Sequence, residues 1–450
     1  MYTTDNLALL TDLYQLTMAQ SYFQSRQLAP ATFSLFIRSY PPNRSYFVSA
    51  GLQDVLKFLE QFKIDSAGID YLYSQRMFSD DFLDFLKRLK FTGEVWAISE
   101  GRLFFKDEPV LEVTAPIVEA QIVETFIMNQ INFQSLIATK AARCVHAAGA
   151  RPVVDFSLRR THGIDAGMKV ARSSYLAGFS GTSNVLAGQH CRIPITGTMA
   201  HSFITSFEHE IDAFRAFVSS FPRHSILLID TYDTVTAASK VVEIAKEMAA
   251  RGQQLQGVRI DSGDLAKLAV EVRKIFDEAG LKNVKIIGSG GLDEYDLADF
   301  NDAKIPYDGY GVGTKMGVSA DAPWSDIAYK LVEYDNRPVL KLSPAKVSLP
   351  GKKQVARIHD KQGKLEKDII TLRGENIEGA EPLLNKVMTE GKISVPLPSL
   401  EEIRSVFLSE FAKLPEPIKA IRNSSRFLVE QSAKLEAHCA LVEQQVSRAQ

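Results

Sequence analysis

Residues 256–291 read QGVRIDSGDLAKLAVEVRKIFDEAGLKNVKIIGSGG, and this stretch decides the fold class that the sequence predicts. A short apolar run comes first, then a segment with helical periodicity, then a second apolar run that ends in glycines. In the helical segment one face carries Leu265, Leu268, Val272, Ile275 and Ala279. Gly280 follows and supplies a C-terminal stop. Alternation of strand and helix predicts a parallel sheet.

The same alternation recurs between residues 151 and 325. The apolar runs are PVVDF (152–156), IPITGT (193–198), SILLIDTY (225–232), QGVRIDS (256–262), VKIIGSG (284–290) and YDGYGVGT (307–314). So many units predict a closed or nearly closed α/β barrel of the TIM type. Each run ends in polar residues or glycines, so we expect the chemistry at the carboxyl ends of the strands.

The segments on either side predict a flanking α+β domain. Residues 1–150 contain helical periodicity at 54–62 and 81–90, strands within 94–115, and a long apolar helix within 117–150 that leads into the barrel. Residues 326–450 contain two hairpins, with turns at 335–336 and 362–363, and helices at roughly 399–413 and 417–445. We expect three segments, 1–150, 151–325 and 326–450, with the hairpins joining the N-terminal strands.

The composition excludes several classes of protein. The 52 basic and 54 acidic residues leave a net charge of −2, which provides no basic field for nucleic acid. No apolar run reaches transmembrane length, and the acidic N-terminus does not resemble a targeting segment. The three cysteines, Cys144, Cys191 and Cys439, lack the spacing of a zinc site, so we expect reduced thiols in a cytoplasmic protein.

Two consecutive predicted strands end in turns suited to phosphate. Small residues let the backbone approach an anion, and the start of the following helix offers N–H groups. The residues concerned are Ser289, Gly290 and Gly291 after one strand, and Gly311, Gly313 and Thr314 after the next. Tight turns without a ligand are the alternative, but two such loops in succession favour a phosphate site.

Charged residues follow two other predicted strands. In GVRIDSGDL (257–265), Asp261 and Asp264 are suited to ribose hydroxyls or Mg²⁺, and Arg259 to an anion. Asp264 could equally be the N-cap of the next helix. In DFSLRRTHG (155–163) an aromatic residue and an arginine pair reach another strand end, as anion ligands or as solvated surface.

His201, in GTMAHSF (197–203), could be a packed residue, a proton carrier, a metal ligand or a nucleophile. Asp230 ends an apolar strand, and a buried carboxylate needs a partner. We expect His201 to be that partner. The other histidines show no paired ligand spacing, which argues against a metal site made of imidazoles.

Taken together and in order, the motifs resemble the nicotinate phosphoribosyltransferase family over residues 8 to about 360. They are TDLYQLTMAQSY, FSLRRTHG, GFSGTSNVLAG, ITGTMAHSF, LIDTYDT, VRIDSGDL, GSGGLDE, YGVGT and YKLV. The resemblance implies a type II phosphoribosyltransferase fold, an irregular α/β barrel beside an α/β domain. It also implies the reaction of nicotinate with phosphoribosyl pyrophosphate, coupled to ATP hydrolysis and using Mg²⁺, as the entry step of NAD salvage.

The resemblance implies the roles of individual residues. Tyr14, from a partner subunit of a homodimer with shared active sites, and Phe156 would enclose the pyridine ring. Arg159 and Arg259 would bind phosphate, pyrophosphate or the nicotinate carboxylate, and Asp261 and Asp264 would serve ribose and Mg²⁺. The two glycine loops would hold the 5′-phosphate. His201 matches a histidine that becomes phosphorylated, with Asp230 orienting it.

Ser183, in SGTSNV, matches the position where nicotinamide-using relatives carry an aspartate, so we expect a preference for nicotinate. Lys140, in SLIATKAAR, departs from the family pattern and receives no role from the resemblance. Two alternatives are a nicotinamide phosphoribosyltransferase or related phosphosugar enzyme, and an inactive barrel that only binds nucleotides. The presence of His201, Asp261 and the SGG loop argues against the inactive barrel.

Overall fold

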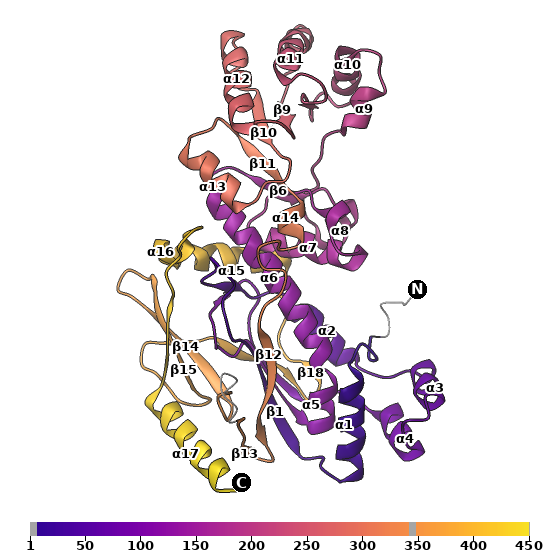
Figure 1. Cartoon of the computed structure of the whole chain (residues 1–450), viewed down its shortest axis with the longest axis vertical. Coiled ribbons are helices and arrows are strands. Elements are labelled where there is room, and N and C mark those ends of the chain that lie inside the picture. Colours follow the sequence, from indigo (N-terminus) through magenta and orange to yellow (C-terminus); the bar gives the residue numbers. More distant parts are fainter. Residues whose placement is uncertain (1–6, 342–347, 450) are drawn as a thin grey trace. The chain divides into compact units, whose positions relative to one another are not determined.

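A computed structural model describes residues 7–341 and 348–449, which form two compact units (Figure 1). Unit 1 consists of the chain up to Leu136 together with the chain from Trp324 onward, and unit 2 is Ile137–Pro323. The chain passes from unit 1 to unit 2 inside helix α6 (Glu124–Ala148), whereas the sequence placed the boundary after residue 150.

Unit 2 is built on a parallel sheet with the strand order β7-β6-β11-β10-β9-β8. Its strands are β6 (Val153–Asp155), β7 (Gly181–Thr182), β8 (Ile226–Leu228), β9 (Gly257–Ile260), β10 (Lys285–Gly288) and β11 (Gly309–Val312). Five of the six predicted apolar runs therefore contain a strand of this sheet. Strand β7 was not predicted, because two residues are too short for periodicity to reveal them.

The sheet is curled but does not close, which corrects the expectation of a closed or nearly closed barrel. Strands β6 and β11 pair with each other, but in the described part of the chain no ladder joins β7 to β8. The predicted strand 193–198 contributes only one parallel bridge, from Ile195 to Thr182 of β7. Pro194 in this run removes a backbone donor, which explains why the strand does not extend.

Helices follow most of these strands. They are η1 (Leu158–Arg160), α7 (Ile164–Leu176), α8 (Val185–Cys191), α9 (His201–Thr205), α10 (Glu210–Ser220), α11 (Thr234–Ala249), α12 (Leu265–Glu278), α13 (Glu294–Asp302) and α14 (Thr314–Gly317). The side chain of Asp264 accepts from Lys267 N at 3.1 Å, so it is the N-cap of α12. The buried residues of α12 are Ala269, Val272 and Phe276. The buried face shares Val272 with the predicted face, but Ala269 and Phe276 take the places expected for Leu268 and Ile275.

The described residues of unit 1 form three sheets, and the largest of them combines strands from both ends of the chain. The largest has the order β13-β12-β1-β5-β3-β17-β18, a second has β16-β14-β15-β19, and β2 pairs with β4. The strands are β1 (Pro30–Ile37), β2 (Phe47–Val48), β3 (Glu94–Ile98), β4 (Leu103–Phe104), β5 (Leu111–Pro116), β12 (Ile327–Tyr334), β13 (Arg337–Pro338), β14 (Lys353–His359), β15 (Leu365–Leu372), β16 (Glu381–Pro382), β17 (Leu384–Thr389), β18 (Lys392–Ile393) and β19 (Leu428–Gln431).

The helices of unit 1 cover these sheets. They are α1 (Leu13–Gln24), α2 (Leu52–Gln61), α3 (Ser66–Ser74), α4 (Asp80–Arg88), α5 (Ile117–Ile122), α15 (Leu400–Lys413), α16 (Glu416–Lys419) and α17 (Ala433–Ala449). The predicted helix 417–445 is wrong, because β19 lies inside it and pairs with β15. Helix α16 ends at Lys419, because Ala420 is already extended with φ −49° and ψ 133°, and the β-favouring residues 427–429 follow.

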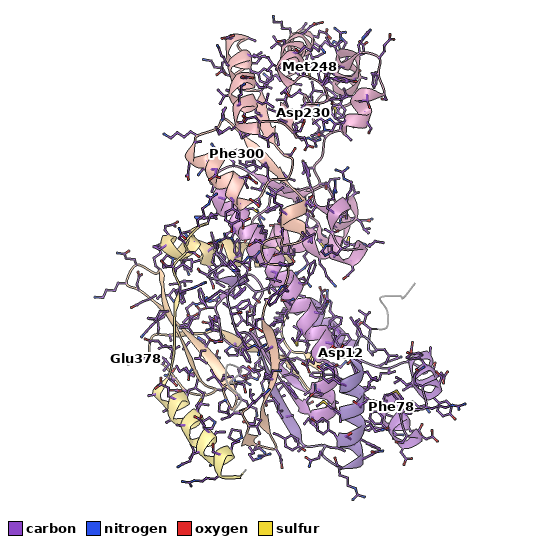
Figure 2. The ribbon with its side chains drawn as sticks, viewed as in Figure 1. Asp12, Phe78, Asp230, Met248, Phe300 and Glu378 are labelled. Carbon is purple, nitrogen blue, oxygen red and sulfur yellow. The ribbon has the colours of Figure 1, made fainter. Side chains whose placement is uncertain are left out.

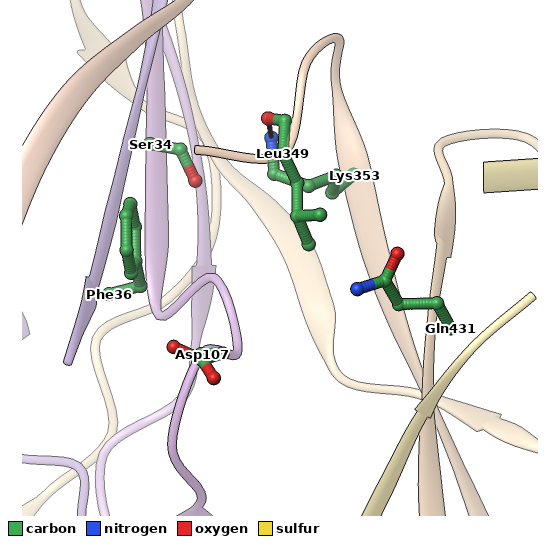
Figure 3. A pocket seen from close by; sticks show the side chains of 6 residues that line it. All are labelled: Ser34, Phe36, Asp107, Leu349, Lys353 and Gln431. Atoms are coloured by element: carbon green, nitrogen blue, oxygen red, sulfur yellow. Dashed lines mark hydrogen bonds between the residues drawn. The ribbon is translucent and has the colours of Figure 1, made fainter. Parts of the chain in front are cut away.

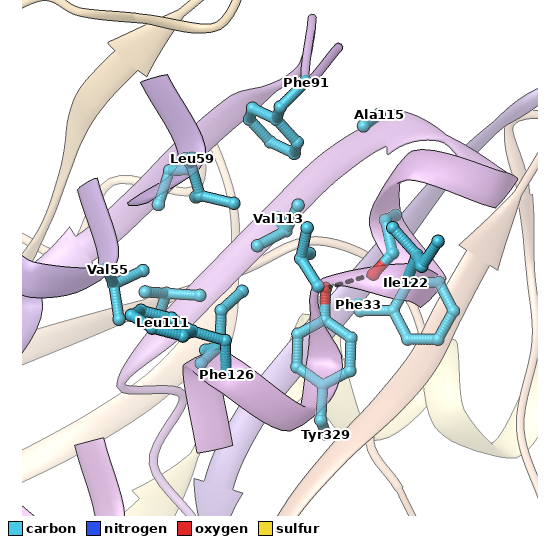
Figure 4. Packing of buried hydrophobic residues seen from close by; sticks show 14 of the residues in the cluster. Phe33, Val55, Leu59, Phe91, Leu111, Val113, Ala115, Ile122, Phe126 and Tyr329 are labelled. Atoms are coloured by element: carbon cyan, nitrogen blue, oxygen red, sulfur yellow. Dashed lines mark hydrogen bonds between the residues drawn. The ribbon is translucent and has the colours of Figure 1, made fainter. Parts of the chain in front are cut away.

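The hydrophobic core of unit 1 lies between the largest sheet and its helices (Figure 4). Phe33 of β1 stacks on Tyr329 of β12 with ring centroids 4.8 Å apart. The Tyr329 hydroxyl donates to Ala120 O at 2.8 Å, which satisfies the polar end of this buried ring. No helix among the described residues is long and apolar enough to cross a membrane.

Candidate functional site

The carboxyl ends of β6, β9, β10 and β11 border a cavity of about 620 Å³ in unit 2. It brings together twelve of the residues singled out from the sequence: Phe156, Arg159, Ser183, His201, Arg259, Asp261, Ser289, Gly290, Gly291, Gly311, Gly313 and Thr314. Leu158, Arg160 and Gly197–Ala200 also line it. The last four lie in the small-residue segment that precedes His201, so the composition of this segment was the available signal.

The two glycine loops need glycine for different reasons. Gly290 has a φ of 98°, and a Cβ there would lie 1.8 Å from the carbonyl oxygen of Asp261. At Gly311 a Cβ would lie 2.4 Å from the ring of Phe156. Glycine at these positions therefore lets the β9 and β10 loops approach each other and leaves room for the aromatic ring.

Asp261 and Arg259 bring opposite charges into the cavity from β9 and its loop. Ser289 Oγ donates to Asp261 Oδ1, which ties the β9 loop to the β10 loop. Arg259 donates from Nη2 to Met199 O at 3.0 Å, and its guanidinium carbon lies 5.8 Å from the Phe156 ring centroid. Its buried Nε has no acceptor among the described residues. Burial also lowers the pKa of Arg259, because it disfavours the charged guanidinium. An anionic ligand would stabilise that positive charge.

His201 is the first residue of α9, and its partner differs from the one expected. Its Nδ1 lies 3.1 Å from Thr231 Oγ1, and its Nε2 lies 3.9 Å from Asp261 Oδ2. Asp230, labelled in Figure 2, instead accepts from Ser262 Oγ at 2.5 Å. The expected contact between His201 and Asp230 is therefore wrong, because the hydroxyl of the next residue occupies Nδ1.

Three predicted site residues lie outside the lining of this cavity: Asp230, Asp264 and Tyr14. Asp264 is exposed and caps α12, which was the alternative reading of its position. Tyr14 belongs to α1 of unit 1, where about half of the residue is exposed. Its hydroxyl accepts from Gln15 Nε2 at 3.3 Å, and burial is the main cause of its raised pKa.

Asp155 is a buried residue of the site that the sequence reasoning missed. Its carboxylate, 1% exposed, accepts from Ser157 N at 2.8 Å, Ser157 Oγ at 2.6 Å and Thr182 Oγ1 at 2.7 Å. These bonds tie the loop that carries Phe156 and Arg159 to the strand end that carries Ser183. The available signal was an aspartate at the end of an apolar strand, as at Asp230.

A smaller cavity of about 200 Å³ lies in unit 1, between β1 and residues Leu349, Lys353 and Gln431 (Figure 3). Among the described residues of its lining the basic one is Lys353, which already pairs with Glu112 at 3.0 Å and donates to the carbonyls of Leu349 and Gly351. That leaves little positive charge for a phosphorylated ligand. The cavity of unit 2 is the candidate site because it brings the predicted residues together.

The chain matches three sequence families along most of its length. Residues 9–132 match the nicotinate phosphoribosyltransferase N-terminal domain, 152–346 the nicotinate phosphoribosyltransferase family, and 378–438 its C-terminal domain. All cavity residues lie within the second of these matches.

Relatives with known names extend this similarity. The chain is 47% identical over 418 residues to nicotinate phosphoribosyltransferase pncB2 of Mycobacterium tuberculosis, covering 93% of this chain and 89% of that one. It is 39% identical over 391 residues to nicotinate phosphoribosyltransferase of Bacillus subtilis, covering 85% and 79%. The crystal structure of human nicotinic acid phosphoribosyltransferase superposes with a TM-score of 0.86 at 29% identity, covering 96% and 99%. The chain belongs to the nicotinate phosphoribosyltransferase family.

Proposed function

We propose that this protein transfers the phosphoribosyl group of phosphoribosyl pyrophosphate to nicotinate, forming nicotinate mononucleotide and pyrophosphate with coupled ATP hydrolysis, in NAD salvage. One observation carries the proposal: a single cavity contains two phosphate-type loops, three arginines, a carboxylate and an aromatic ring. Such a set suits a substrate that has phosphates at both ends and a planar acceptor.

The acceptor base would lie beside Phe156, with Arg159 or Arg259 pairing with its carboxylate. Ser183 lines the same cavity and is neutral, so it can donate a hydrogen bond to a carboxylate without repelling it. A ring from Tyr14 of a partner subunit would enclose the other face, which is why we propose a homodimer with shared active sites. The exposure of Tyr14 leaves its ring free for such a contact.

The phosphates would lie on the glycine loops. Gly290 and Gly291 have positive φ values, and Thr314 begins α14, so backbone N–H groups border the cavity on both loops. Ser289 is held by Asp261, which fixes the start of the first loop. Arg259, with its unpaired Nε, would neutralise further negative charge.

The reaction requires the protein to position the substrates and to stabilise charge, and it does not require a general base. The ring nitrogen of nicotinate carries a free lone pair at neutral pH, so no proton has to be removed before it attacks C1 of the ribose. As that carbon loses pyrophosphate it becomes positively charged. The carboxylate of Asp261 in the cavity can stabilise that charge, and the arginines can stabilise the leaving pyrophosphate.

Mg²⁺ fits this cavity as a partner of the substrate. Within the described residues no group of three or more histidine, cysteine or acidic side chains could cage a metal. Mg²⁺ commonly binds one or two carboxylates together with phosphate oxygens and water. Asp261 would hold it, whereas Asp264 uses Oδ1 to cap α12 and has one carboxylate oxygen left. Bound there, Mg²⁺ would neutralise pyrophosphate.

ATP would act through His201. Attack on the γ-phosphorus needs a neutral imidazole with one nitrogen free, and a Thr231 hydroxyl that accepts the Nδ1 hydrogen leaves the Nε2 lone pair available. The Nε2–P bond would form as the bond to ADP breaks, and water would later hydrolyse the phosphohistidine. We also propose a cytoplasmic location, which the three free thiols support.

The test is pyrophosphate release from phosphoribosyl pyrophosphate by purified protein, with nicotinate, nicotinamide or no base, each with and without ATP. We expect release only with nicotinate and faster release with ATP. Equal turnover of nicotinamide would favour a nicotinamide phosphoribosyltransferase, and no release with either base would contradict the proposed reaction.

A further inference from the structure

A buried cluster of four charged residues lies in unit 2 outside the cavity lining, and it includes Lys140. Lys140 Nζ pairs with Glu294 Oε2 and lies 2.8 Å from Asp321 Oδ1, and Arg143 Nε lies 3.0 Å from Glu294 Oε1. The side chains of Lys140 and Glu294 are fully buried, that of Arg143 is 1% exposed, and that of Asp321 is 17% exposed. The cluster contains two cations and two anions.

The two anions belong to the segments that follow the two phosphate-type loops in the chain. Glu294 is the first residue of α13 and follows Gly291 of the first loop by three positions. Asp321 follows the short helix α14, which begins at Thr314 of the second loop. Lys140 is the cation that contacts both anions, so its ammonium group joins the segments that follow the two loops.

The loops are joined a second time nearer the surface. Lys315, next to Thr314, lies 3.2 Å from the carboxylate of Asp293, the N-cap of α13. Asp293 and Glu294 therefore place two carboxylates beside a loop suited to phosphate, and each has a cation bound to it. Without those cations, an anionic substrate would meet like charge at this position.

Keeping such a cluster in the interior is costly, which argues that it has a use beyond packing. Buried ion pairs are often no more stabilising than apolar residues of similar size. Burial by itself lowers the pKa of Lys140, but the negative charges of Glu294 and Asp321 outweigh it and raise that pKa above its ordinary value. Lys140 therefore carries a charge at neutral pH, and the anions that face it need that charge.

We propose that Lys140 is a positioning residue for the phosphate groups of the substrate. By bridging Glu294 and Asp321 it fixes the spacing of the two glycine loops and cancels the negative charge of Glu294 before the substrate binds. This inference rests on the proposed function. It assigns Lys140 to the binding of phosphoribosyl pyrophosphate and not to the binding of nicotinate.

The test is the variant Lys140→Met, with the KM values of both substrates, kcat and thermal stability measured. We expect the KM for phosphoribosyl pyrophosphate to rise about tenfold, as misplaced loops lose contacts, while the KM for nicotinate stays within about twofold. The double variant Lys140→Met/Asp321→Asn restores equal numbers of cations and anions and keeps the Arg143–Glu294 pair. We expect its KM for phosphoribosyl pyrophosphate to be about threefold lower than that of Lys140→Met.

Lys240→Met is the matched control, because Lys240 also pairs with a buried glutamate of unit 2, Glu210, at 2.9 Å. It should leave both KM values unchanged, since Glu210 and Lys240 belong to α10 and α11 and not to the segments that follow the two glycine loops. If Lys140→Met does not fold, Lys140→Gln, whose amide can still donate to Glu294, replaces it with the same expected direction.

Two results with Lys140→Met would overturn the inference. In the first, both KM values stay within twofold of wild type. In the second, both KM values rise together, as they would if the fold were loosened in general. Calorimetric binding of phosphoribosyl pyrophosphate to each variant separates this question from the reaction itself. An inactive wild type that still binds this ligand more tightly than Lys140→Met would contradict the proposed function and support the role of Lys140.

Discussion

Nδ1 of His201 lies 3.1 Å from Oγ1 of Thr231, the residue that follows Asp230 in the chain. A threonine hydroxyl can accept the Nδ1 hydrogen and then donate its own hydrogen elsewhere, so it can fix the tautomer without adding a charge. The opposite nitrogen, Nε2, is 3.9 Å from Asp261 Oδ2, beyond hydrogen-bond distance, and remains available as a nucleophile.

Replacing Thr231 by valine should slow phosphorylation of His201 by roughly tenfold, because the Nδ1 hydrogen loses its acceptor. The measurement is acid-labile label on the protein after incubation with γ-labelled ATP. Thr231→Ser keeps the hydroxyl and should label like wild type, and His201→Ala should not label. Full labelling of His201→Ala would show that His201 is not the nucleophile.

An aspartate at position 183 should weaken the use of nicotinate. It would place a carboxylate beside a carboxylate substrate, and like charges at close range oppose binding. We expect kcat/KM for nicotinate to fall by roughly tenfold or more in Ser183→Asp, and by less in Ser183→Ala. An unchanged kcat/KM in Ser183→Asp would show that Ser183 does not face the base.

Mixing two variants that each lack ATP-stimulated activity tests whether subunits share active sites. Tyr14→Ala lacks the stacking ring and His201→Ala lacks the imidazole, so a mixed dimer would contain one site with neither defect. Activity should therefore return after subunit exchange, toward one quarter of the wild-type value if association is random. If exchange is demonstrated by mass spectrometry and no activity returns, the sharing of sites by Tyr14 is wrong.

Alanine substitutions at two neighbouring glycines distinguish the effect of a steric clash from the effect of a positive φ. Gly290→Ala would place a Cβ 1.8 Å from Asp261 O, whereas at Gly291 nothing lies within 4 Å of the added carbon. Both positions have positive φ, which should cost each substitution about 1 kcal/mol of stability, and the clash at Gly290 adds to that cost. Only Gly290→Ala should also displace Asp261 and raise the KM for phosphoribosyl pyrophosphate. Equal KM values in the two variants would contradict this assignment.

The sequence predicted the parallel sheet of unit 2 because its strands are apolar runs separated by amphipathic helices. The failures have local causes. Strand β7 has two residues, Pro194 interrupts the strand expected at 193–198, and β19 is hidden in a segment with helical character on both sides. In that segment Ser432, whose hydroxyl accepts from Leu435 N at 3.2 Å, marked the true start of the last helix.

The cavity residues were predictable because strand ends of a parallel sheet meet at one edge, as the motifs around Phe156, Asp261 and Ser289 do. Their partners were not. Nothing in the sequence distinguishes Thr231 from Asp230 as the neighbour of His201. The two residues are adjacent, and the local backbone conformation after β8 decides which side chain reaches the imidazole. The partners of Lys140 likewise lie more than 150 positions away in the chain, and only folding brings them together.

The most direct test of the proposed function is detection of the new bond between the nicotinate ring nitrogen and the ribose. Purified protein would be incubated with ¹⁵N-nicotinate, phosphoribosyl pyrophosphate, Mg²⁺ and ATP, and the ring nitrogen followed by NMR. The proposed reaction predicts a new signal from a substituted pyridinium nitrogen coupled to the ribose anomeric proton, at a rate equal to pyrophosphate release. Release of pyrophosphate while the nicotinate signal stays unchanged would contradict it.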